Sequence, residues 1–369
     1  MPFMEIDLEK YRNNIDKILE KIIDKSQMMA VVKSDAYGLG IEKMSKIAFE
    51  KGIRWFGIAD IDEAKILRNI FNDSINILRL LPCTIDEVES IIKYNVIPIV
   101  SSIEEISAFS KIGIKNNKKV EIHLGVDTGM GRIGFLTNEL TDMLERVSGL
   151  KGISIKGLFS HFPCADEKDE SFTLLQLRIF NGISAEIEKK TGKKLIKHIA
   201  NSSSVFRYED SCLDLIRCGI SMYGANPSSF LKLEGIKNIV SVKAKVILIK
   251  NLHKDSGVSY GRTFVAKEEK KIALIDIGYG KGFSRLFSSN GYVLIKGKKA
   301  DILGRVTMDI TAVDITDISN VKIGDEVVII GSQGEEFINI DEYSSRMNTI
   351  PYEVFCVMGK ILKRKYAGE

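Results

Sequence analysis

Reactive side chains follow five separate apolar runs in the first two-thirds of the sequence. They are Lys33, Arg132, His161, Ser202 next to Asn201, and Arg217. Any one of them alone is more often a solvated or structural group than a catalyst. In a closed barrel of parallel strands, however, the carboxyl ends of all strands meet at one rim, where barrel enzymes gather their reactive groups. Five such residues after five runs therefore predict an active site at that rim.

Lys33 is the candidate for covalent chemistry. It follows the apolar residues 28–32 and directly precedes Ser34. An amine at the mouth of an apolar strand is partly desolvated, and desolvation disfavours its charged form. The neutral amine is a nucleophile that condenses with carbonyl compounds. The sequence therefore indicates a lysine that could hold a carbonyl group.

The elements that must position these residues alternate between apolar runs and helix-like segments. The runs are residues 28–33, 54–59, 75–80, 96–100, 120–126, 153–161, 195–199 and 213–216, and the helix-like segments are 40–51, 60–70, 84–94, 102–111, 138–148 and 170–190. Runs that are apolar without alternation suit parallel strands covered on both sides. Eight strand–helix units predict an α/β fold with a closed (β/α)8 TIM barrel. An open doubly wound sheet is the alternative, but the glycine-rich dinucleotide turn expected after its first strand is missing from this sequence.

The pattern changes near residue 235. Extended runs with little helical periodicity follow at residues 239–252, 271–277, 292–296, 301–315 and 326–330, separated by turns rich in glycine. We therefore expect an N-terminal strand in residues 1–10 that pairs with the second domain, a barrel over residues 11–235, and a mostly-β C-terminal domain over residues 236–369. The basic run at residues 360–365 is interpreted as a solvated tail.

Composition excludes several classes of function. The 53 basic and 49 acidic residues give a net charge of only +4, without the concentrated basic face that nucleic-acid binding needs. No apolar stretch reaches the roughly 18 residues of a membrane-spanning helix, and the N-terminus lacks a charged-then-apolar signal. The five cysteines are scattered without a CxxC spacing, and the four histidines have no partners at metal-ligand spacing. We therefore expect a cytoplasmic protein that binds no nucleic acid, membrane or metal.

Residues 30–40 read Ala-Val-Val-Lys-Ser-Asp-Ala-Tyr-Gly-Leu-Gly and resemble the pyridoxal-phosphate attachment motif of the alanine racemase family. Further segments similar to that family follow in order through both expected domains, at residues 127–134, 157–162, 199–202, 217–224, 257–262, 277–279, 304–309 and 349–353. The resemblance implies pyridoxal 5'-phosphate as cofactor and the racemisation of L- and D-alanine. It also implies a homodimer with shared active sites and a role in D-alanine biosynthesis for peptidoglycan.

The resemblance also assigns roles to individual residues. Lys33 would hold the cofactor and act as one base, and Tyr260 would be the second base on the opposite face of the substrate, with His161 and Arg217 in support. Arg217 would face the pyridine nitrogen, and because a guanidinium only donates hydrogen bonds, that nitrogen would stay unprotonated, which favours simple reprotonation. The phosphate ligands would be Tyr37, Ser202, Gly219, Ile220 and Tyr352, and the substrate carboxylate would meet Arg132 and the backbone of Met308. Tyr260 and Met308 would come from the partner chain.

Two positions depart from the commonest pattern of the family. Gly125 stands where a carbamylated lysine usually orients the substrate-binding arginine, and Thr307 stands where cysteine is common before Met308. We expect Gly125 to leave a void beside Arg132 that a small anion such as chloride, or ordered water, fills. Because both positions touch the substrate pocket, a broader-specificity racemase acting on serine, lysine or another amino acid stays open.

Two other functions are weighed against racemisation. A non-catalytic pyridoxal-phosphate carrier on a similar barrel would lack the second domain. A decarboxylase with both domains would bring a cysteine and an aspartate from the partner chain, which Thr307 disfavours. The bulk of Tyr352, by contrast, favours a substrate with a small side chain.

Overall fold

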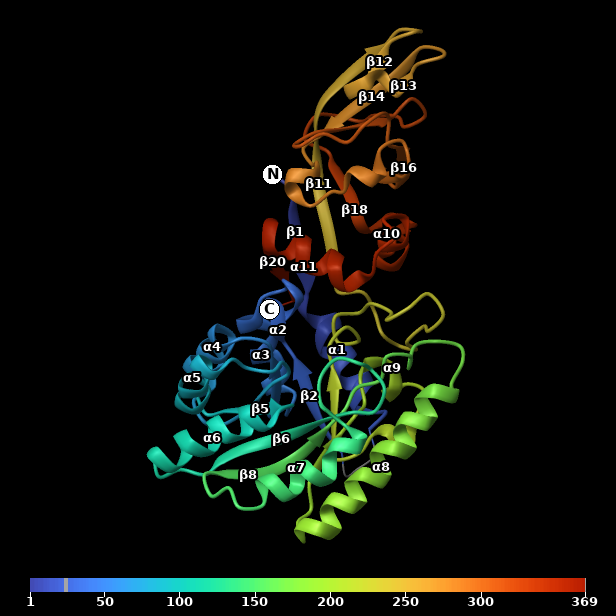
Figure 1. Ribbon diagram of the computed structural model, residues 1–369. Coiled ribbons are helices and arrows are strands. Elements are labelled where there is room, and N and C mark those ends of the chain that lie inside the picture. The colour runs from blue at the N-terminus through green and yellow to red at the C-terminus, as the bar shows by residue number, and fades with distance from the viewer. Residues whose placement is uncertain (23–25, 369) are drawn as a thin grey trace.

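In the computed structural model, which describes residues 1–22 and 26–368, eight parallel strands close into a barrel and confirm the predicted TIM barrel (Figure 1). In spatial order they are β10 (Leu215–Cys218), β2 (Gln27–Val31), β3 (Trp55–Ile58), β4 (Asn76–Arg79), β5 (Val96–Val100), β6 (Val120–Asp127), β8 (Ile153–Phe159) and β9 (Ile196–His198), and the short β7 (Phe135–Leu136) pairs with β6. Two backbone hydrogen bonds of 3.1 Å, from Asp214 to the Lys197 carbonyl and from Arg217 to the Ala200 carbonyl, join β10 to β9.

Helices cover the outside of the barrel. They are α1 (Leu8–Leu19), α3 (Ile41–Glu50), α4 (Ile61–Phe71), α5 (Val88–Lys93), α6 (Ile103–Lys115), α7 (Leu140–Val147), α8 (Ser171–Thr191) and α9 (Ser202–Val205), with 3-10 turns at Ile85–Glu87, Thr137–Glu139 and Glu209–Ser211. Side-chain caps fix where they begin: the Asp60 carboxylate accepts from the Glu63 amide at 3.0 Å, and the Ser102 hydroxyl accepts from the Glu105 amide at 3.2 Å. No helix of the described residues is long and apolar enough to cross a membrane.

The second domain is built on the long strand β11 (Val240–Leu252) and is mostly β. One edge of β11 pairs with β18 (Glu326–Gln333), followed by β15 (Tyr292–Ile295) and β16 (Lys298–Asp301), and the other pairs with β1 (Phe3–Asp7), followed by β20 (Lys363–Ala367). The remaining elements are β12 (Gly257–Val258), β13 (Phe264–Val265), β14 (Lys270–Ile275), β17 (Thr311–Asp314), β19 (Glu336–Ile338), α10 (Ile340–Arg346), α11 (Pro351–Ile361) and the 3-10 turns Tyr260–Arg262, Tyr279–Lys281 and Arg285–Phe287. Both ends of the chain therefore lie in the same sheet.

Residues 301–315 do not form the single extended run that the sequence indicates. β16 ends at Asp301 and β17 begins at Thr311. Between them Gly304 has a φ of +68°, and an added Cβ there would lie 2.6 Å from the Val258 carbonyl oxygen. The chain turns at this position because only glycine tolerates both the left-handed backbone and the close approach.

The basic run at residues 360–365 is not a solvated tail. Its second half belongs to β20, which lies parallel to β1. Lys363 and Lys365 are exposed, whereas Arg364 and Tyr366, on the other face of the strand, are partly buried and bond to the barrel. The expectation of a solvated tail is wrong because lysines on the exposed face of the strand mask the alternation of exposed and partly buried side chains.

The turn that follows the first barrel strand is left-handed. Ser34, Asp35, Ala36 and Tyr37, within α2 (Lys33–Tyr37), all have φ between 53° and 59°. For ordinary residues this conformation costs roughly 1–2 kcal/mol each. The turn is still closed by helix-like hydrogen bonds, such as that from the Ala36 amide to the Val32 carbonyl at 2.7 Å. The surrounding fold must therefore hold these four residues in place.

Helix α11 packs on this turn through Gly359. An added Cβ at Gly359 would lie 2.2 Å from the Gly38 carbonyl oxygen, whereas one at Gly182, on the exposed face of α8, would meet no atom within 4 Å. We expect Gly359→Ala to lower the free energy of unfolding by about 1–3 kcal/mol through overpacking. Gly182→Ala, the matched control, should raise it by about 0.5–1 kcal/mol. Denaturant unfolding measures both, and a Gly359→Ala protein as stable as the parent would show that this contact does not support the turn.

Candidate active site

A cavity of about 430 Å³ lies at the carboxyl end of the barrel, beside the left-handed turn. Nine residues predicted from the sequence line it: Lys33, Tyr37, Arg132, His161, Ser202, Arg217, Gly219, Ile220 and Tyr352. Eight of them come from the ends of barrel strands or from the segments that follow, and Tyr352 comes from α11. The structure therefore gathers side chains from five strands and the second domain in one place.

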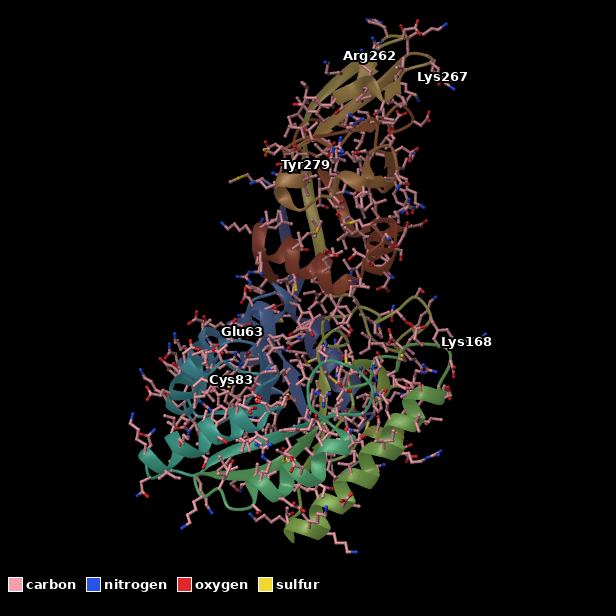
Figure 2. The ribbon with its side chains drawn as sticks, viewed as in Figure 1. Glu63, Cys83, Lys168, Arg262, Lys267 and Tyr279 are labelled. Atoms are coloured by element: carbon pink, nitrogen blue, oxygen red, sulfur yellow. The ribbon has the colours of Figure 1, made fainter. Side chains whose placement is uncertain are left out.

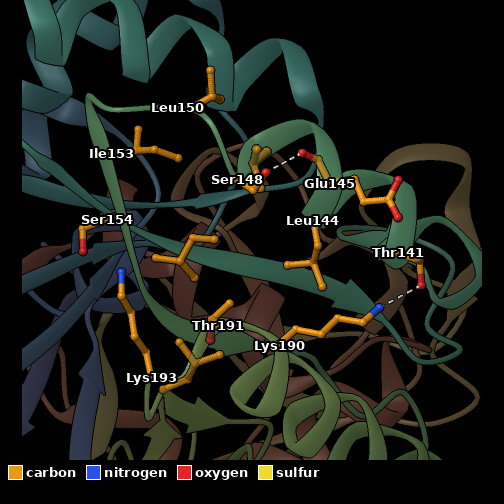
Figure 3. A pocket seen from close by; sticks show the side chains of 13 residues that line it. Thr141, Leu144, Glu145, Ser148, Leu150, Ile153, Ser154, Lys190, Thr191 and Lys193 are labelled. Atoms are coloured by element: carbon orange, nitrogen blue, oxygen red, sulfur yellow. Dashed lines mark hydrogen bonds between the residues drawn. The ribbon is translucent and has the colours of Figure 1, made fainter.

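A second cavity of about 440 Å³ lies at the opposite end of the barrel, between α7 and the end of α8 (Figure 3). Its walls include the apolar side chains of Leu144 and Ile153, and at its edge Lys190 donates a 3.4 Å hydrogen bond to Thr141. The described residues that line it include none of the candidate catalytic groups. Chemistry rather than size therefore identifies the first cavity as the candidate site.

Lys33 stands at the start of the left-handed turn, half-buried in the wall of the cavity. Burial lowers the pKa of its amine, and the positive charge of Arg132 lowers it further, against the opposing effect of the Glu63 carboxylate. The neutral amine is therefore more accessible than that of a surface lysine. It suits a nucleophile or a base.

Arg217 is buried in the cavity wall and is held by neutral acceptors. Its guanidinium donates to the Ser160 carbonyl at 2.8 Å and the Ile199 carbonyl at 3.1 Å, and to ring nitrogens of His161 and His198. Burial lowers its pKa to about 9, so it stays protonated near neutral pH. Because these partners carry no charge, the positive charge of Arg217 remains available to a group in the cavity.

Three histidines, of which His123 and His198 are buried and His161 is partly buried, are neutral, and their tautomers are fixed. A guanidinium can only donate, so Nδ1 of His161 and Nδ1 of His198, at 2.9 and 3.1 Å from Arg217, must accept. The Nε2–H of His198 then donates to Nδ1 of His123 at 2.8 Å, and Nε2 of His123 is left buried with no partner among the described residues. Burial lowers the pKa of His161 and His198 well below the ordinary value, and that of His123 to about 3.

Hydroxyl groups and backbone amides cluster next to the left-handed turn. The Ser202 hydroxyl accepts from the Gly219 amide at 3.1 Å and lies 3.0 Å from the Ser221 hydroxyl. The Tyr37 hydroxyl packs against Gly219, where an added Cβ would be 2.5 Å from its oxygen, and the Tyr37 and Tyr352 rings lie 5.9 Å apart. Burial raises the pKa of both phenols, which therefore stay neutral donors. Such a set can bind a phosphate without a full counter-charge.

Asp127 organises the loop that presents Arg132. Its carboxylate accepts hydrogen bonds from the amides of Gly129, Met130, Gly131 and Arg132 at 2.8–3.1 Å. Burial raises the pKa of Asp127, but these four amides outweigh it and hold the pKa below its usual range. The sequence analysis did not single out Asp127, although an aspartate at the start of a glycine-rich segment is a known turn signal.

Neighbouring atoms lie close to the Cβ position of Gly125. An added Cβ there would lie 3.1 Å from the Gly134 α-carbon and 3.2 Å from side-chain atoms of Ile99 and Ser101. The first atom of a side chain at position 125 would therefore be crowded. Arg132 is exposed in the single chain. The expectation that a small anion or ordered water lies beside Arg132 stays a prediction, because these contacts concern only the first atom of a side chain at position 125 and Arg132 lines a cavity that a partner chain is expected to complete.

Tyr260 and Met308 do not line the cavity of their own chain. Tyr260 lies between β12 and β13, at the tip of the second domain. Figure 2 labels Arg262, from the same 3-10 turn, at this tip and Glu63, which contacts the turn after Lys33, in the barrel far below it. Tyr260 is 72% exposed and Met308 is 56% exposed. Within one chain, the structure therefore does not bring the two predicted bases together.

Several lining residues were missed by the sequence analysis, namely Leu80, Leu81, Phe159 and Cys356. The Phe159 ring lies 4.6 Å from the Arg217 guanidinium carbon and covers one of its faces. Cys356 belongs to α11, a helix inside a domain interpreted from its strands. The sequence signal for this helix is Pro351, because proline is common at the first position of a helix, where it stands here.

Sequence profiles for two domains match most of the chain. The profile "Alanine racemase, N-terminal domain" matches residues 6–227, and "Alanine racemase, C-terminal domain" matches residues 239–366. An alanine racemase of Clostridium perfringens (strain SM101 / Type A) is 37% identical over 367 residues, which cover 98% of this chain and 94% of the relative.

Solved structures show the same likeness. An alanine racemase from D-cycloserine-producing Streptomyces lavendulae superposes with a TM-score of 0.94 at 30% identity and covers 100% of this chain and 97% of that one. An alanine racemase from Bartonella henselae with covalently bound pyridoxal phosphate has a TM-score of 0.91 at 29% identity and covers 99% of each chain. The likeness therefore spans both domains.

The neutral histidines should make the protein less stable in acid. The pKa of His123 is about 3 in the fold against an ordinary 6.5, so below pH 6.5 the unfolded chain binds more protons than the folded one. The free energy of unfolding should fall as the pH decreases from about 7 to 4, by up to about 1.4 kcal/mol per pH unit and proton. His123→Asn, which keeps an acceptor for His198, should flatten this slope, and the exposed control His253→Asn should not. Identical slopes in both variants, measured by denaturant unfolding, would contradict a neutral His123.

Proposed function

Because the chain belongs to the alanine racemase family, we propose that it interconverts L- and D-alanine with two bases, Lys33 of one subunit and Tyr260 of the partner subunit. One of them removes the α-proton and the other returns a proton on the opposite face. The observation that carries the proposal is a half-buried lysine, with a lowered amine pKa, in the same cavity as a buried guanidinium and a cluster of neutral donors. The chain is an amino-acid racemase of this family. Alanine as its substrate, and Lys33 and Tyr260 as its bases, are what we propose.

The cavity residues fit pyridoxal 5'-phosphate, the cofactor of the family. When bound, this group withdraws electrons from the substrate and so acidifies its α-carbon. Lys33 would hold it through the amine, and its phosphate would meet the hydroxyls of Tyr37, Ser202 and Tyr352 and the amides of Gly219 and Ile220. The packing supports this fit, because a Cβ on Gly219 would displace the Tyr37 hydroxyl from the cluster.

Arg217 would donate a hydrogen bond to the pyridine nitrogen. Its guanidinium keeps its proton near neutral pH, and its protein partners are all neutral. A donor that does not release its proton leaves an aromatic nitrogen unprotonated, which moderates electron withdrawal. Moderate withdrawal favours the quick return of a proton over competing reactions, as racemisation requires.

Racemisation removes the α-proton on one face of the substrate and returns a proton on the other. Lys33 occupies one wall of the cavity, and its amine is easily neutral. Tyr260 is exposed at the tip of the second domain, so a second copy of the chain would bring it to the opposite face. His161 lines the same cavity and carries its proton on Nε2, which is available to stabilise a tyrosine phenolate.

Arg132 and the backbone of Met308 of the partner subunit would bind the substrate carboxylate. Neither departure visibly opens the pocket next to its own backbone: a Cβ on Gly125 would meet three atoms at 3.1–3.2 Å, and the Thr307 hydroxyl donates to the Ile310 carbonyl at 2.7 Å. These two observations support alanine over a broader-specificity racemase for serine or lysine.

Replacement of Tyr260 by phenylalanine tests this function. We expect racemisation of alanine to fall by about 10²–10⁴-fold, because one proton donor is lost, while the cofactor remains bound. In deuterium oxide, the α-proton should still exchange in one enantiomer, the one that presents it to Lys33. Chiral chromatography and mass spectrometry of the recovered alanine measure both quantities.

The matched control is Tyr292→Phe, which removes only a 2.8 Å hydrogen bond to Glu342 in the same domain and should racemise alanine like the parent. Equal residual exchange of both enantiomers in Tyr260→Phe would contradict the two-base assignment. A parent enzyme that racemises serine or lysine but not alanine would overturn the proposed substrate.

A further inference from the structure

The last strand of the second domain reaches the turn that carries Lys33. β20 is the edge strand of its sheet, and Figure 1 shows it with α11 at the junction of the two domains, next to α2. Its exposed side chains are Lys363 and Lys365, and its partly buried ones are Arg364 and Tyr366. The partly buried pair faces the barrel.

Arg364 and Tyr366 bond directly to the turn and its end. The Arg364 guanidinium forms an ion pair with the Asp35 carboxylate and donates a 3.2 Å hydrogen bond to the Gly38 carbonyl. The Tyr366 hydroxyl donates a 3.0 Å hydrogen bond to the Leu39 carbonyl. The edge strand of the second domain therefore contacts this segment at three residues, Asp35, Gly38 and Leu39.

The barrel holds the same turn from its other side. The buried carboxylate of Glu63 accepts the Asp35 amide at 3.1 Å, and the Asp35 carboxylate caps α3 by accepting the Ile41 amide at 2.7 Å. Asp35 thus lies between a barrel contact and Arg364. Since its own backbone is left-handed, with φ of 56°, it needs support from both sides.

We propose that Arg364 is a positioning residue that keeps the left-handed turn in shape and thereby aims Lys33 and Tyr37 into the cavity. These two residues are the first and last of α2, so relaxation of the turn displaces both. The side chains of Arg364 and Asp35 are 30% and 42% exposed, so their ion pair alone contributes little. Arg364 instead restrains the turn by its position, because its guanidinium, held on the edge strand β20, bonds both the Asp35 carboxylate and the Gly38 carbonyl.

The inference rests on the proposed function for the roles of Lys33 and Tyr37. The test replaces Arg364 by methionine in the full chain. We expect amide hydrogen exchange at Gly38 and Gly40, which bond to the Ser34 and Asp35 carbonyls, to accelerate about tenfold or more in the cofactor-free protein. Affinity for pyridoxal phosphate, from spectrophotometric titration, should fall about tenfold.

Three further variants complete the design. Lys363→Met removes a positive charge from the exposed face of the same strand and should change neither quantity. Both hydrogen bonds of Arg364 come from Nη1, and Arg364→Lys keeps a charged donor that ends one bond short of this atom, so it should recover part of the affinity. Tyr366→Phe, which loses one hydrogen bond, should change both quantities in the same direction by less, and it decides the question if Arg364→Met does not fold.

The proposal is overturned if Arg364→Met and Tyr366→Phe match Lys363→Met in exchange and in affinity. It is also overturned if amides of β11 accelerate as much as Gly38 and Gly40, because Arg364 would then support the fold in general. If the parent protein does not bind pyridoxal phosphate through Lys33, the proposed function fails, yet the exchange rates still decide whether Arg364 holds the turn.

Discussion

The left-handed turn after Lys33 is the constraint on which the arrangement of the molecule depends. Four successive residues other than glycine adopt a backbone that costs roughly 1–2 kcal/mol each, so the turn cannot hold itself. Glu63 supports it from the barrel, Gly359 of α11 packs against it, and Arg364 bonds it from β20. The second domain, which contains both ends of the chain, therefore takes part in shaping a site that lies in the barrel.

Charge in the cavity has one sign. Lys33, Arg132 and Arg217 line it, and no carboxylate does among the described lining residues. The histidines bonded to Arg217 are neutral, so they neither cancel nor add to this charge. A cavity of this kind suits ligands that carry a phosphate and a carboxylate. The positive charge of the cavity also favours the neutral amine of Lys33, since burial and the neighbouring Arg132 both lower its pKa.

The sequence predicted the barrel well because its strands are apolar runs covered on both sides, and the site residues of the barrel because they directly follow those strands. Features that depend on distant contacts escaped it. Nothing in Ser34 to Tyr37 marks a positive φ, since glycine is absent, and the strand β20 was hidden by its exposed lysines. The crowding at the Cβ position of Gly125 depends on the Gly134 backbone, which folds back from nine residues further along the chain.

We propose that each active site combines Lys33 of one subunit with Tyr260 of the partner subunit. Mixing a Lys33→Ala chain with a Tyr260→Phe chain tests it most directly, because one site of a mixed dimer lacks both residues and the other keeps both. Random re-pairing should restore about a quarter of the parental racemase activity, far more than either variant shows alone. No recovery of activity, in a sample where native mass spectrometry shows mixed dimers, would contradict the account, since the two bases would then have to belong to the same chain.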